Sequence, residues 1–325
     1  MRFLAHPADE GACGFYRLAL PANALIRLDR IEGAVQQLTA FDPLFLQKNA
    51  ITNVIVQRQT EPHQAVLIES YQRYKIQVTH DLDDLLWDAP AYNPYRKMFT
   101  LANRKSIDKV LAISDVLTAS TVPLADKIKR KTKRSVSVIP NMIPPNMAQP
   151  IRQRVSPRLR IGWAGSLTHF HDLDDVMYVI RSTLDKYQWV FFGWCPEDIK
   201  PRVEFHPFVK FDEYMQKLAS LQLDVALAPL LPNHFNECKS NLKLLEYGIL
   251  GYPVISTDVY PYKDNPCVKV KPGKKAWKEW LGAIEAYDAN ESLRLDHANR
   301  AQQYAQLFDI GVPANRALIR KGWGL

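Results

Sequence analysis

The most informative part of the chain ends near residue 256 and reads Asn236-Glu237-Cys238-Lys239-Ser240-Asn241-Leu242-Lys243-Leu244-Leu245-Glu246-Tyr247-Gly248-Ile249-Leu250-Gly251-Tyr252-Pro253-Val254-Ile255-Ser256. Its apolar residues recur at helical spacing, so the pattern predicts a helix over residues 239–250 that buries Leu242, Leu245 and Leu250. The helix stops at Gly251, and a strand begins at Pro253. A helix followed at once by an apolar strand is typical of a parallel α/β sheet.

The predicted helix carries three charged residues that suggest a ligand. Lys239 and Lys243 are four residues apart and would share one face, where either could neutralise a diphosphate. Glu246 interrupts an apolar run, and its carboxylate could accept hydrogen bonds from ribose hydroxyls. A solvated helix face would explain the lysines but not this acid.

Outward from this stretch, strands and helices alternate in both halves of the chain. Strands are predicted at Arg2–Ala5, Asn53–Arg58, Lys75–His80, Lys109–Ser114 and Ser135–Pro140, and again at Arg158–Ala164, Gln188–Gly193, Val203–Phe208, Asp224–Pro229, Pro253–Ser256 and Val268–Val270. Helices are predicted at Tyr16–Asp29, Pro62–Arg73, Tyr95–Ser106, Val122–Lys131, Asp174–Tyr187, Phe211–Ser220, Lys239–Leu250 and Lys275–Tyr287. Buried strands that alternate with helices indicate parallel sheets covered on both faces.

A proline-rich linker near residues 141–150 separates the two halves. We therefore expect an α/β fold of two Rossmann-like domains facing each other across a cleft. The expected domains are residues 1–145, on the acceptor side, and residues 146–305, on the donor side. A helical segment, residues 306–325, would either close the second domain or cross back to the first.

Composition narrows the functional classes. The 325 residues carry a net charge of +8, and 47% of them are apolar, as in ordinary globular proteins. The four cysteines lie far apart without a Cys-x-x-Cys pair, which argues against a disulfide scaffold, a zinc ribbon and a thioredoxin-type site. Neither a signal peptide nor a membrane-spanning stretch is apparent. We expect a cytoplasmic protein whose contact with a membrane, if any, is peripheral and on the inner face.

Two glycine loops, each after the first strand of its domain, are candidate phosphate sites. Gly11 and Gly14, followed by Arg17, open the first helix, and Gly165-Ser166 precedes a helix in the second half. Backbone amides at such turns favour anions. A tight turn is the alternative reading of the first loop, and a glycine required for packing is that of the second. Dinucleotide, Walker and nucleophile-elbow motifs are absent from the sequence.

Three stretches of the sequence together resemble a known family of enzymes. The string Lys239–Tyr247, followed by Gly251-x-Pro253-Val254-Ile255, resembles the donor-binding helix of GT-B glycosyltransferases, especially the retaining nucleotide-sugar group (group 1, family 4-like). The loop Gly162-Trp163-Ala164-Gly165-Ser166 is similar to the start of their second domain, and Val138-Ile139-Pro140-Asn141 to their linker.

The resemblance implies a metal-independent, retaining glycosyltransferase without a cofactor, whose donor is most simply a UDP- or GDP-sugar. Glu246 would bind the ribose, and the rest of the donor would lie against Gly165, Ser166, Lys239, Ser240, Asn241 and Lys243. Two departures concern the sugar: Cys238 stands where the family has the first Glu of Glu-x7-Glu, and Ser240-Asn241 replaces a Phe-Gly step.

An acidic cluster follows a strand of the first half and comprises His80, Asp81, Asp83 and Asp84. The resemblance suggests that it lines the acceptor side and that His80 or one of the aspartates is catalytic. Asp81-x-Asp83 also matches the metal motif of the other glycosyltransferase fold, but the two-domain pattern favours a site without metal. Helix capping is the alternative role of these acids. His169 and His171 lack a third metal ligand at a recognisable spacing.

The acceptor is the open part of the sequence-based prediction. The basic run Lys127–Arg134 could attract an anionic membrane with a lipid-linked sugar or glycan, or nucleic acid, as in a DNA-modifying enzyme of the phage type. It could equally be a solvated helix end. A non-catalytic nucleotide- or nucleic-acid-binding protein and a two-domain epimerase are the alternative functions on this scaffold.

Overall fold

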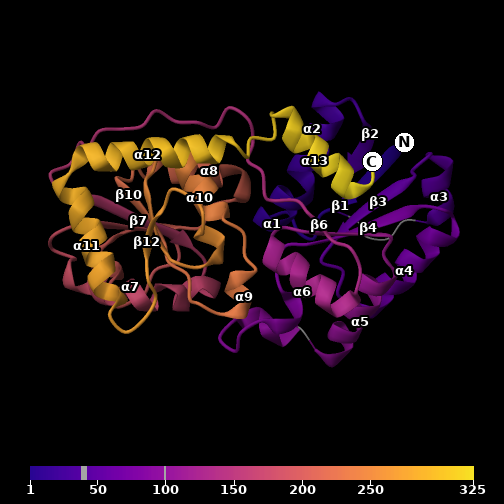
Figure 1. Cartoon of the computed structure of the whole chain (residues 1–325), viewed down its shortest axis with the longest axis horizontal. Helices are drawn as coiled ribbons and strands as arrows, with labels where there is room; N and C mark the ends of the chain where they lie inside the picture. The colour runs from indigo at the N-terminus through magenta and orange to yellow at the C-terminus, as the bar shows by residue number, and fades with distance from the viewer. Residues whose placement is uncertain (38–41, 99) are drawn as a thin grey trace. The chain divides into compact units, whose positions relative to one another are not determined.

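A computed structural model describes residues 1–37, 42–98 and 100–325 of the chain. Within these residues the chain divides into two compact units, each assembled from separate segments (Figure 1). The first unit comprises Met1–Pro145, Cys238–Ser240 and Phe308–Leu325. The second comprises Asn146–Glu237 and Asn241–Leu307.

The first unit is built on a parallel sheet whose described strands run in the order β2-β1-β3-β4-β5-β6. They are β1 Arg2–His6, β2 Glu32–Val35, β3 Asn53–Gln57, β4 Gln77–Leu82, β5 Val116–Ala119 and β6 Ser137–Val138. The central strand β3 is buried along its whole length, which explains its unbroken apolar centre Val54-Ile55-Val56.

Helices cover both faces of this sheet, with α2 and α13 on one side and α4, α5 and α6 on the other (Figure 1). The helical segments are α1 Ala12–Gly14, the π-helical turn η1 Phe15–Ala19, α2 Leu20–Leu28, α3 Pro43–Lys48, α4 Pro62–Arg73, the 3-10 turns η2 Leu86–Asp88 and η3 Pro94–Met98, α5 Leu101–Ile113, α6 Val122–Thr132 and α13 Pro313–Trp323. Ile68 and Tyr71 of α4 pack on Val54 and Val78 of the sheet, which makes one apolar core.

One predicted strand of the first half is wrong. Residues 109–114 belong to α5, which runs from Leu101 to Ile113, and the strand follows at Val116–Ala119. The apolar run was ambiguous because Ile107, Val110 and Leu111 are spaced as the buried face of a helix. The helix predicted over 95–106 begins six residues later than expected, where Thr100 caps it by accepting from the Asn103 amide; Phe99 lies outside the described residues.

The second unit repeats the architecture closely. Its described strands are parallel and run in the order β12-β11-β10-β7-β8-β9. They are β7 Arg160–Gly165, β8 Gln188–Gly193, β9 Glu204–Pro207, β10 Val225–Ala228, β11 Val254–Thr257 and β12 Val268–Val270. Its helical segments are η4 Leu167–Leu173, α7 Asp174–Ser182, η5 Lys200–Arg202, α8 Phe211–Ser220, α9 His234–Glu237, α10 Leu242–Ile249, η6 Tyr260–Tyr262, α11 Ala276–Ala289 and α12 Glu291–Gln306.

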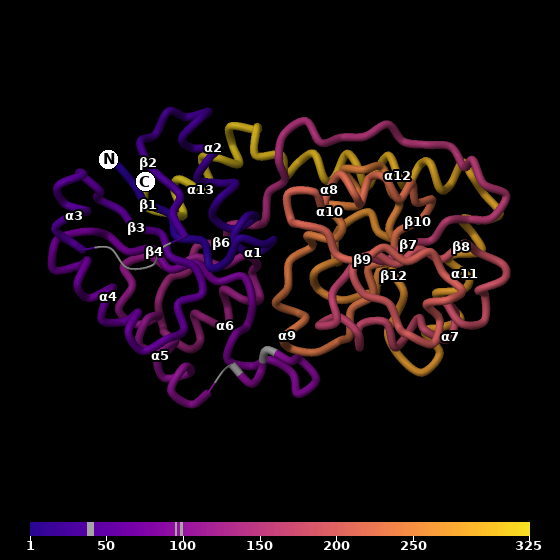
Figure 2. The backbone as a smooth tube through the Cα atoms, turned by 180° about the vertical axis from the view of Figure 1, so that it is seen from behind, coloured from indigo at the N-terminus to yellow at the C-terminus, as the bar shows by residue number. Residues whose placement is uncertain are grey.

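The C-terminal segment completes the first unit. Viewed from behind, α13 lies beside α2 and close to the N-terminal strand (Figure 2). The carbonyl of Trp323 accepts a hydrogen bond from Thr79 Oγ1 at 3.0 Å, and Arg316 Nε pairs with Asp29 Oδ1 at 2.7 Å. The indole of Trp323 is buried with its ring centroid 6.1 Å from that of Phe3. The last eighteen residues therefore belong to the first unit, and Ile319 and Trp323 are buried in its core.

Candidate active site

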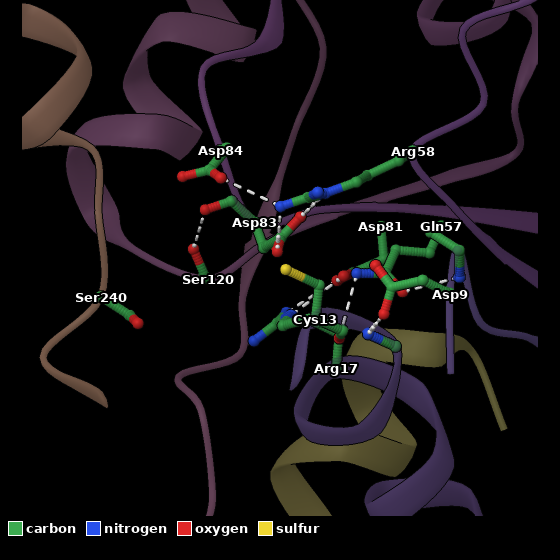
Figure 3. A network of polar contacts seen from close by, with 12 residues as sticks. Asp9, Cys13, Arg17, Gln57, Arg58, Asp81, Asp83, Asp84, Ser120 and Ser240 are labelled. Carbon is green, nitrogen blue, oxygen red and sulfur yellow. Dashed lines mark hydrogen bonds and ion pairs between the residues drawn. The ribbon is translucent and has the colours of Figure 1, made fainter. Parts of the chain in front are cut away.

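A polar network occupies the ends of β1, β3, β4 and β5 in the first unit (Figure 3). The carboxyl ends of parallel strands meet at one edge of the sheet, which is where such folds bind ligands. The acidic residues of the β4 end, Asp81, Asp83 and Asp84, all lie in this network, as the sequence predicts for that strand. Each of them faces a basic side chain from another segment.

Arg17 and Asp81 form a buried ion pair at the base of the network. Arg17 Nε and Nη2 donate to the two carboxylate oxygens of Asp81 at 2.9 and 2.7 Å, and the side chains are 2% and 0% exposed. Arg17 Nη1 also donates to the carbonyl of Ile139, while Thr118 Oγ1 donates to Asp81. The predicted phosphate ligand and the predicted catalytic acid therefore satisfy one another beneath the surface of the site.

A second cationic group, Arg58, holds the two outer aspartates. Its Nε and Nη2 donate to Asp83 at 2.5 and 2.7 Å, and Nη2 also donates to Asp84 Oδ2 at 2.9 Å. Lys239 Nζ lies 3.5 Å from the other oxygen of Asp84. Arg58 has a left-handed backbone with φ of 51°, a conformation that costs energy for any residue other than glycine and is frequent at functional sites.

The charges of this network perturb its neighbours. Burial alone would raise the pKa of Asp83, but the charge and hydrogen bonds of Arg58 hold that pKa below its usual value. Burial, reinforced by the negative charge of Asp83, raises the pKa of the Cys13 thiol well above its usual value. Cys13 is therefore a neutral thiol beside an ionised carboxylate.

His80 lies deeper than the sequence suggests. It is 1% exposed within β4, and its Nε2 accepts from the backbone amide of Gln59 at 3.1 Å. Its Nδ1 has no hydrogen-bond partner among the described residues. Burial lowers the pKa of His80 to about 3, so the imidazole is neutral at physiological pH.

An acidic side chain fills the first glycine loop. Asp9 Oδ1 accepts from the backbone amides of Gly11 and Gly14 at 2.9 and 3.0 Å (Figure 3). A Cβ on Gly14 would lie only 1.9 Å from the carbonyl oxygen of Asp9, so the turn requires glycine there. The amides predicted to receive a phosphate are thus already paired with a carboxylate of the chain.

The second glycine loop lies at the end of β7 in the second unit. Ser166 Oγ shares a hydrogen bond of 2.6 Å with Thr168 Oγ1. Lys243 Nζ lies 5.5 Å from the ring centroid of the buried Trp163 and donates to the carbonyl of Ala164. Tyr247, one turn further along α10, accepts from the Ala164 amide at 2.9 Å. Gly165, Ser166 and Lys243 are therefore brought together, as the sequence predicts.

Glu246 is a buried acid on the same helix. It is 5% exposed, and Tyr214 Oη of α8 donates to its Oε2 at 3.3 Å. The ring of Tyr214 stacks on Phe192, with centroids 5.3 Å apart and planes 19° apart. A buried carboxylate on a helix that accepts from one hydroxyl group is a candidate to accept hydrogen bonds from the hydroxyl groups of a ligand.

The predicted shared face of Lys239 and Lys243 is wrong, because α10 begins at Leu242 and not at residue 239. Lys239 and Ser240 belong instead to the tripeptide of the first unit, where Asn141 Nδ2 donates to Ser240 Oγ at 2.9 Å. Asn241 stays with the second unit and donates to Tyr304 Oη at 3.0 Å. Leu242 is only half-buried, whereas Leu245 and Leu250 are buried as predicted.

Three basic side chains of the predicted run have local contacts, and the first is Arg130, whose Nε donates to the carbonyl of Asp126 at 3.3 Å. Arg134 donates through both Nη atoms to the carbonyls of Leu111, Ala112 and Asp115, at the end of α5. Lys131 Nζ pairs with Asp108 at 2.6 Å. The run is therefore partly a structural cap.

Two negative findings complete the inventory. Within residues 1–37, 42–98 and 100–325, no group of three His, Cys, Asp or Glu side chains is arranged to hold a metal ion. In the same part of the chain, every helix is too short or too polar to cross a bilayer.

Sequence reasoning missed four contributors, namely Asp9, Arg58, Trp163 and Tyr214. Asp9 and Arg58 each stand just after a strand, so their position at a strand end was a usable signal. The roles of Trp163 and Tyr214 arise from long-range packing, which no local pattern reports.

Comparison with solved structures identifies the fold. A crystal structure of Anabaena Alr3699/HepE in complex with UDP-glucose aligns with a TM-score of 0.66 at 13% identity, covering 100% of both chains. Sucrose-phosphate synthase from Thermosynechococcus elongatus aligns with a TM-score of 0.62 at 13% identity, covering 86% of this chain and 74% of its own. An alpha-glucosyltransferase in complex with UDP-glucose and DNA containing an abasic site aligns with a TM-score of 0.59 at 10% identity, covering 95% of each chain.

The chain has the GT-B fold of two Rossmann-like α/β domains, so the predicted fold class is confirmed. Neither known family models nor curated protein sequences match it.

Proposed function

We propose that the protein is a glycosyltransferase that binds a nucleotide-sugar, most simply a UDP- or GDP-sugar, on its second unit. The observation that carries the proposal is the buried Glu246, which lies on α10 one turn after Lys243, the residue that donates to the carbonyl of Ala164 next to Gly165 and Ser166. A carboxylate for the ribose and a lysine for the diphosphate on one short helix form a nucleotide site. The fold supports this reading, because two of its structural neighbours were solved with UDP-glucose.

In this proposal, charge stabilisation of the leaving group drives the reaction. Lys243, together with the backbone amides of Gly165 and Ser166, would balance the negative charge that develops on the departing diphosphate. Lys239, which belongs to the first unit, is the other lysine of the predicted donor-binding set. These groups can act without a metal ion, and the resemblance of residues 239–247 to the retaining group extends the proposal to retention at the anomeric carbon.

The first unit would receive the acceptor. We propose that Asp83 and Asp84, which are partly exposed, contact the acceptor and are the catalytic carboxylates of the predicted set. Asp81 and His80 are buried beneath them and would position this edge. Glycans and lipid-linked sugars present hydroxyl groups to such a site. DNA would do so where a base carries a hydroxyl group, and transfer to it would make the protein a DNA-modifying enzyme.

Calorimetric titration with UDP, GDP, ADP and CMP, each with and without EDTA, tests the donor site. We expect one nucleoside diphosphate to bind in EDTA and to raise the melting temperature. Glu246→Gln should weaken its binding by about 1–3 kcal/mol, because a charged hydrogen bond to the ribose is lost. The matched control is Glu213→Gln, an exposed acid on α8, which should bind normally.

Other outcomes would redirect the proposal. If no nucleotide binds, or if both variants bind as the wild type does, the donor site is not where we propose it. If a nucleotide binds without transfer to any acceptor, the non-catalytic binding protein is the better reading. Consumption of the nucleotide-sugar without an acceptor would indicate an epimerase.

A further inference from the structure

The net charge of the protein is concentrated in one segment. Residues 89–134 contain eleven Lys and Arg but three Asp and Glu, a net charge of +8 that equals the net charge of the entire chain. The remaining residues are therefore electrically balanced. Between Asp88 and Asp108 the sequence has no acid at all. A concentration of this kind sets up a local positive potential that the average composition conceals.

Two contacts of Lys131 connect α6 to the neighbouring elements. Lys131 of α6 pairs with Asp108 of α5, and its Nζ lies 5.4 Å from the ring centroid of Trp87, which follows β4. Arg104 and Lys105 precede Asp108 by one helical turn, and Lys127 precedes Lys131 by one turn, so these side chains surround the same junction. Both backbone views show α5 and α6 side by side on one flank of the first unit (Figures 1 and 2).

We define the basic surface as the exposed or half-exposed Arg96, Lys97, Arg104, Lys105, Lys127, Lys129, Arg130 and Lys133. The stability of the helices does not explain the whole basic surface. Arg104 ends the first turn of α5, and Lys105 follows it directly; positive charge near this end opposes the helix dipole. Lys129, Arg130 and Lys131 in the last turn of α6, and Arg96 and Lys97 in the last turn of η3, are placed to stabilise a helix, but Arg104, Lys105 and Lys127 are not.

Exposed aliphatic side chains accompany the charges. Leu101, at the start of α5, is 71% exposed, and Val122, at the start of α6, is 50% exposed. The acid-free stretch also contains Tyr92, whose side chain is half-buried. A phosphodiester backbone gains little from aliphatic groups, whereas a lipid surface accepts them below its charged headgroups. Basic residues mixed with aliphatic and aromatic ones are typical of segments at a membrane interface.

We propose that the basic surface binds an anionic phospholipid membrane peripherally, with Leu101 inserted among the headgroups. This proposal does not depend on the identity of the donor or on glycosyl transfer. It goes beyond the proposed function by assigning the protein a surface on which it works. The protein would then encounter a lipid-linked acceptor by diffusing along the membrane surface rather than through solution.

Vesicle co-sedimentation of the full chain tests the proposal. The probes are vesicles of phosphatidylcholine alone and vesicles that also contain phosphatidylglycerol, at about 0.1 M salt, where the screening length is about 10 Å. We expect binding only to the anionic vesicles. The variant Lys105→Gln, Lys129→Gln, Arg130→Gln should bind about a hundredfold more weakly, because each base near the surface contributes about 1 kcal/mol, or about fivefold.

A matched triple variant, Lys271→Gln, Lys274→Gln, Lys278→Gln, removes the same charge from exposed positions of the second unit and should bind as the wild type does. Leu101→Ser should leave the preference for anionic vesicles but lower the fraction that stays bound in high salt. Melting curves check that each variant folds, and the shifts should be small because every replaced side chain is exposed.

The proposal is overturned if the wild type ignores phosphatidylglycerol, or if the two triple variants lose binding equally. A duplex DNA titration runs alongside. If DNA binds and the first triple variant loses that binding while vesicles are ignored, the surface serves nucleic acid and the membrane assignment is wrong.

Discussion

Replacing Asp81 by Asn should destabilise the protein severely, because it leaves the guanidinium of Arg17 buried without its counterion. The two side chains are 2% and 0% exposed and share two hydrogen bonds of 2.9 and 2.7 Å. Removal of one partner from a buried pair costs about 3–5 kcal/mol of unfolding free energy. For a domain of this size each kcal/mol lowers the melting temperature by roughly 2–4 °C, so a loss of about 10 °C is expected.

Urea denaturation followed by fluorescence measures the loss, and a double-mutant cycle isolates its cause. Arg17→Met combined with Asp81→Leu removes both charges, so the double variant should be more stable than either single variant carrying an unpaired charge. The matched exposed pair is Arg181 and Asp198, where Asp198→Asn should leave the free energy of unfolding close to that of the wild type, because solvent screens an exposed pair. If Asp81→Asn costs no more than Asp198→Asn, or if the single losses simply add in the double variant, Asp81 is not held by Arg17 in the way described.

Three further predictions concern the site. His80 has a pKa lowered by burial to about 3, against about 6.5 when unfolded, so the unfolded state binds the extra proton between these values. The free energy of unfolding should thus fall as the pH drops below 6.5. Its slope against pH should be up to about 1.4 kcal/mol per pH unit steeper in the wild type than in His80→Gln. Equal slopes in urea titrations would contradict this prediction. Gly165→Ala should weaken nucleotide binding in calorimetry, because the new Cβ would lie 2.4 Å from the ring of the buried Trp163. The control Gly282→Ala, which has open space around it, should bind normally. Equal affinities of the two variants would contradict the steric argument. Lys239→Met should change the free energy of unfolding by less than about 1 kcal/mol, because the ion pair of Lys239 with Asp84 is partly exposed. The same variant should lower the rate of glycosyl transfer. An unchanged rate would mean that Lys239 has no part in the mechanism.

Much of the fold could be predicted from local sequence. Strands β8 and β12 and helix α8 have the predicted bounds, because each is a compact run flanked by turn residues. The prediction failed for residues 109–114, where a short apolar run fits strand and helix equally well and only packing on the sheet decides. Strand β2 was missed because its residues, Glu32-Gly33-Ala34-Val35, lack the strongly apolar character of a buried strand.

The candidate site could be predicted by residue type and by strand end, but not by pairing. Sequence places Asp81 and Arg17 at the ends of neighbouring elements, yet their mutual neutralisation depends on a contact 64 residues apart in the chain. Lys239 and Lys243 look equivalent in sequence, but the helix begins between them and each belongs to a different unit. The local pattern therefore identifies candidate groups, whereas long-range contacts decide which are available to a ligand.

The discontinuous make-up of the first unit has a consequence for biosynthesis. The strands β1–β6 leave the ribosome early, but the helix that covers Phe3 and binds Thr79 through Trp323 is synthesised after the whole second unit. Until then α2 covers this face of the first sheet without α13, and the apolar surface that α13 would bury stays exposed, which favours aggregation and chaperone binding. A truncated chain that ends before residue 308 should contain the whole sequence of the second unit, but its first unit should not fold completely.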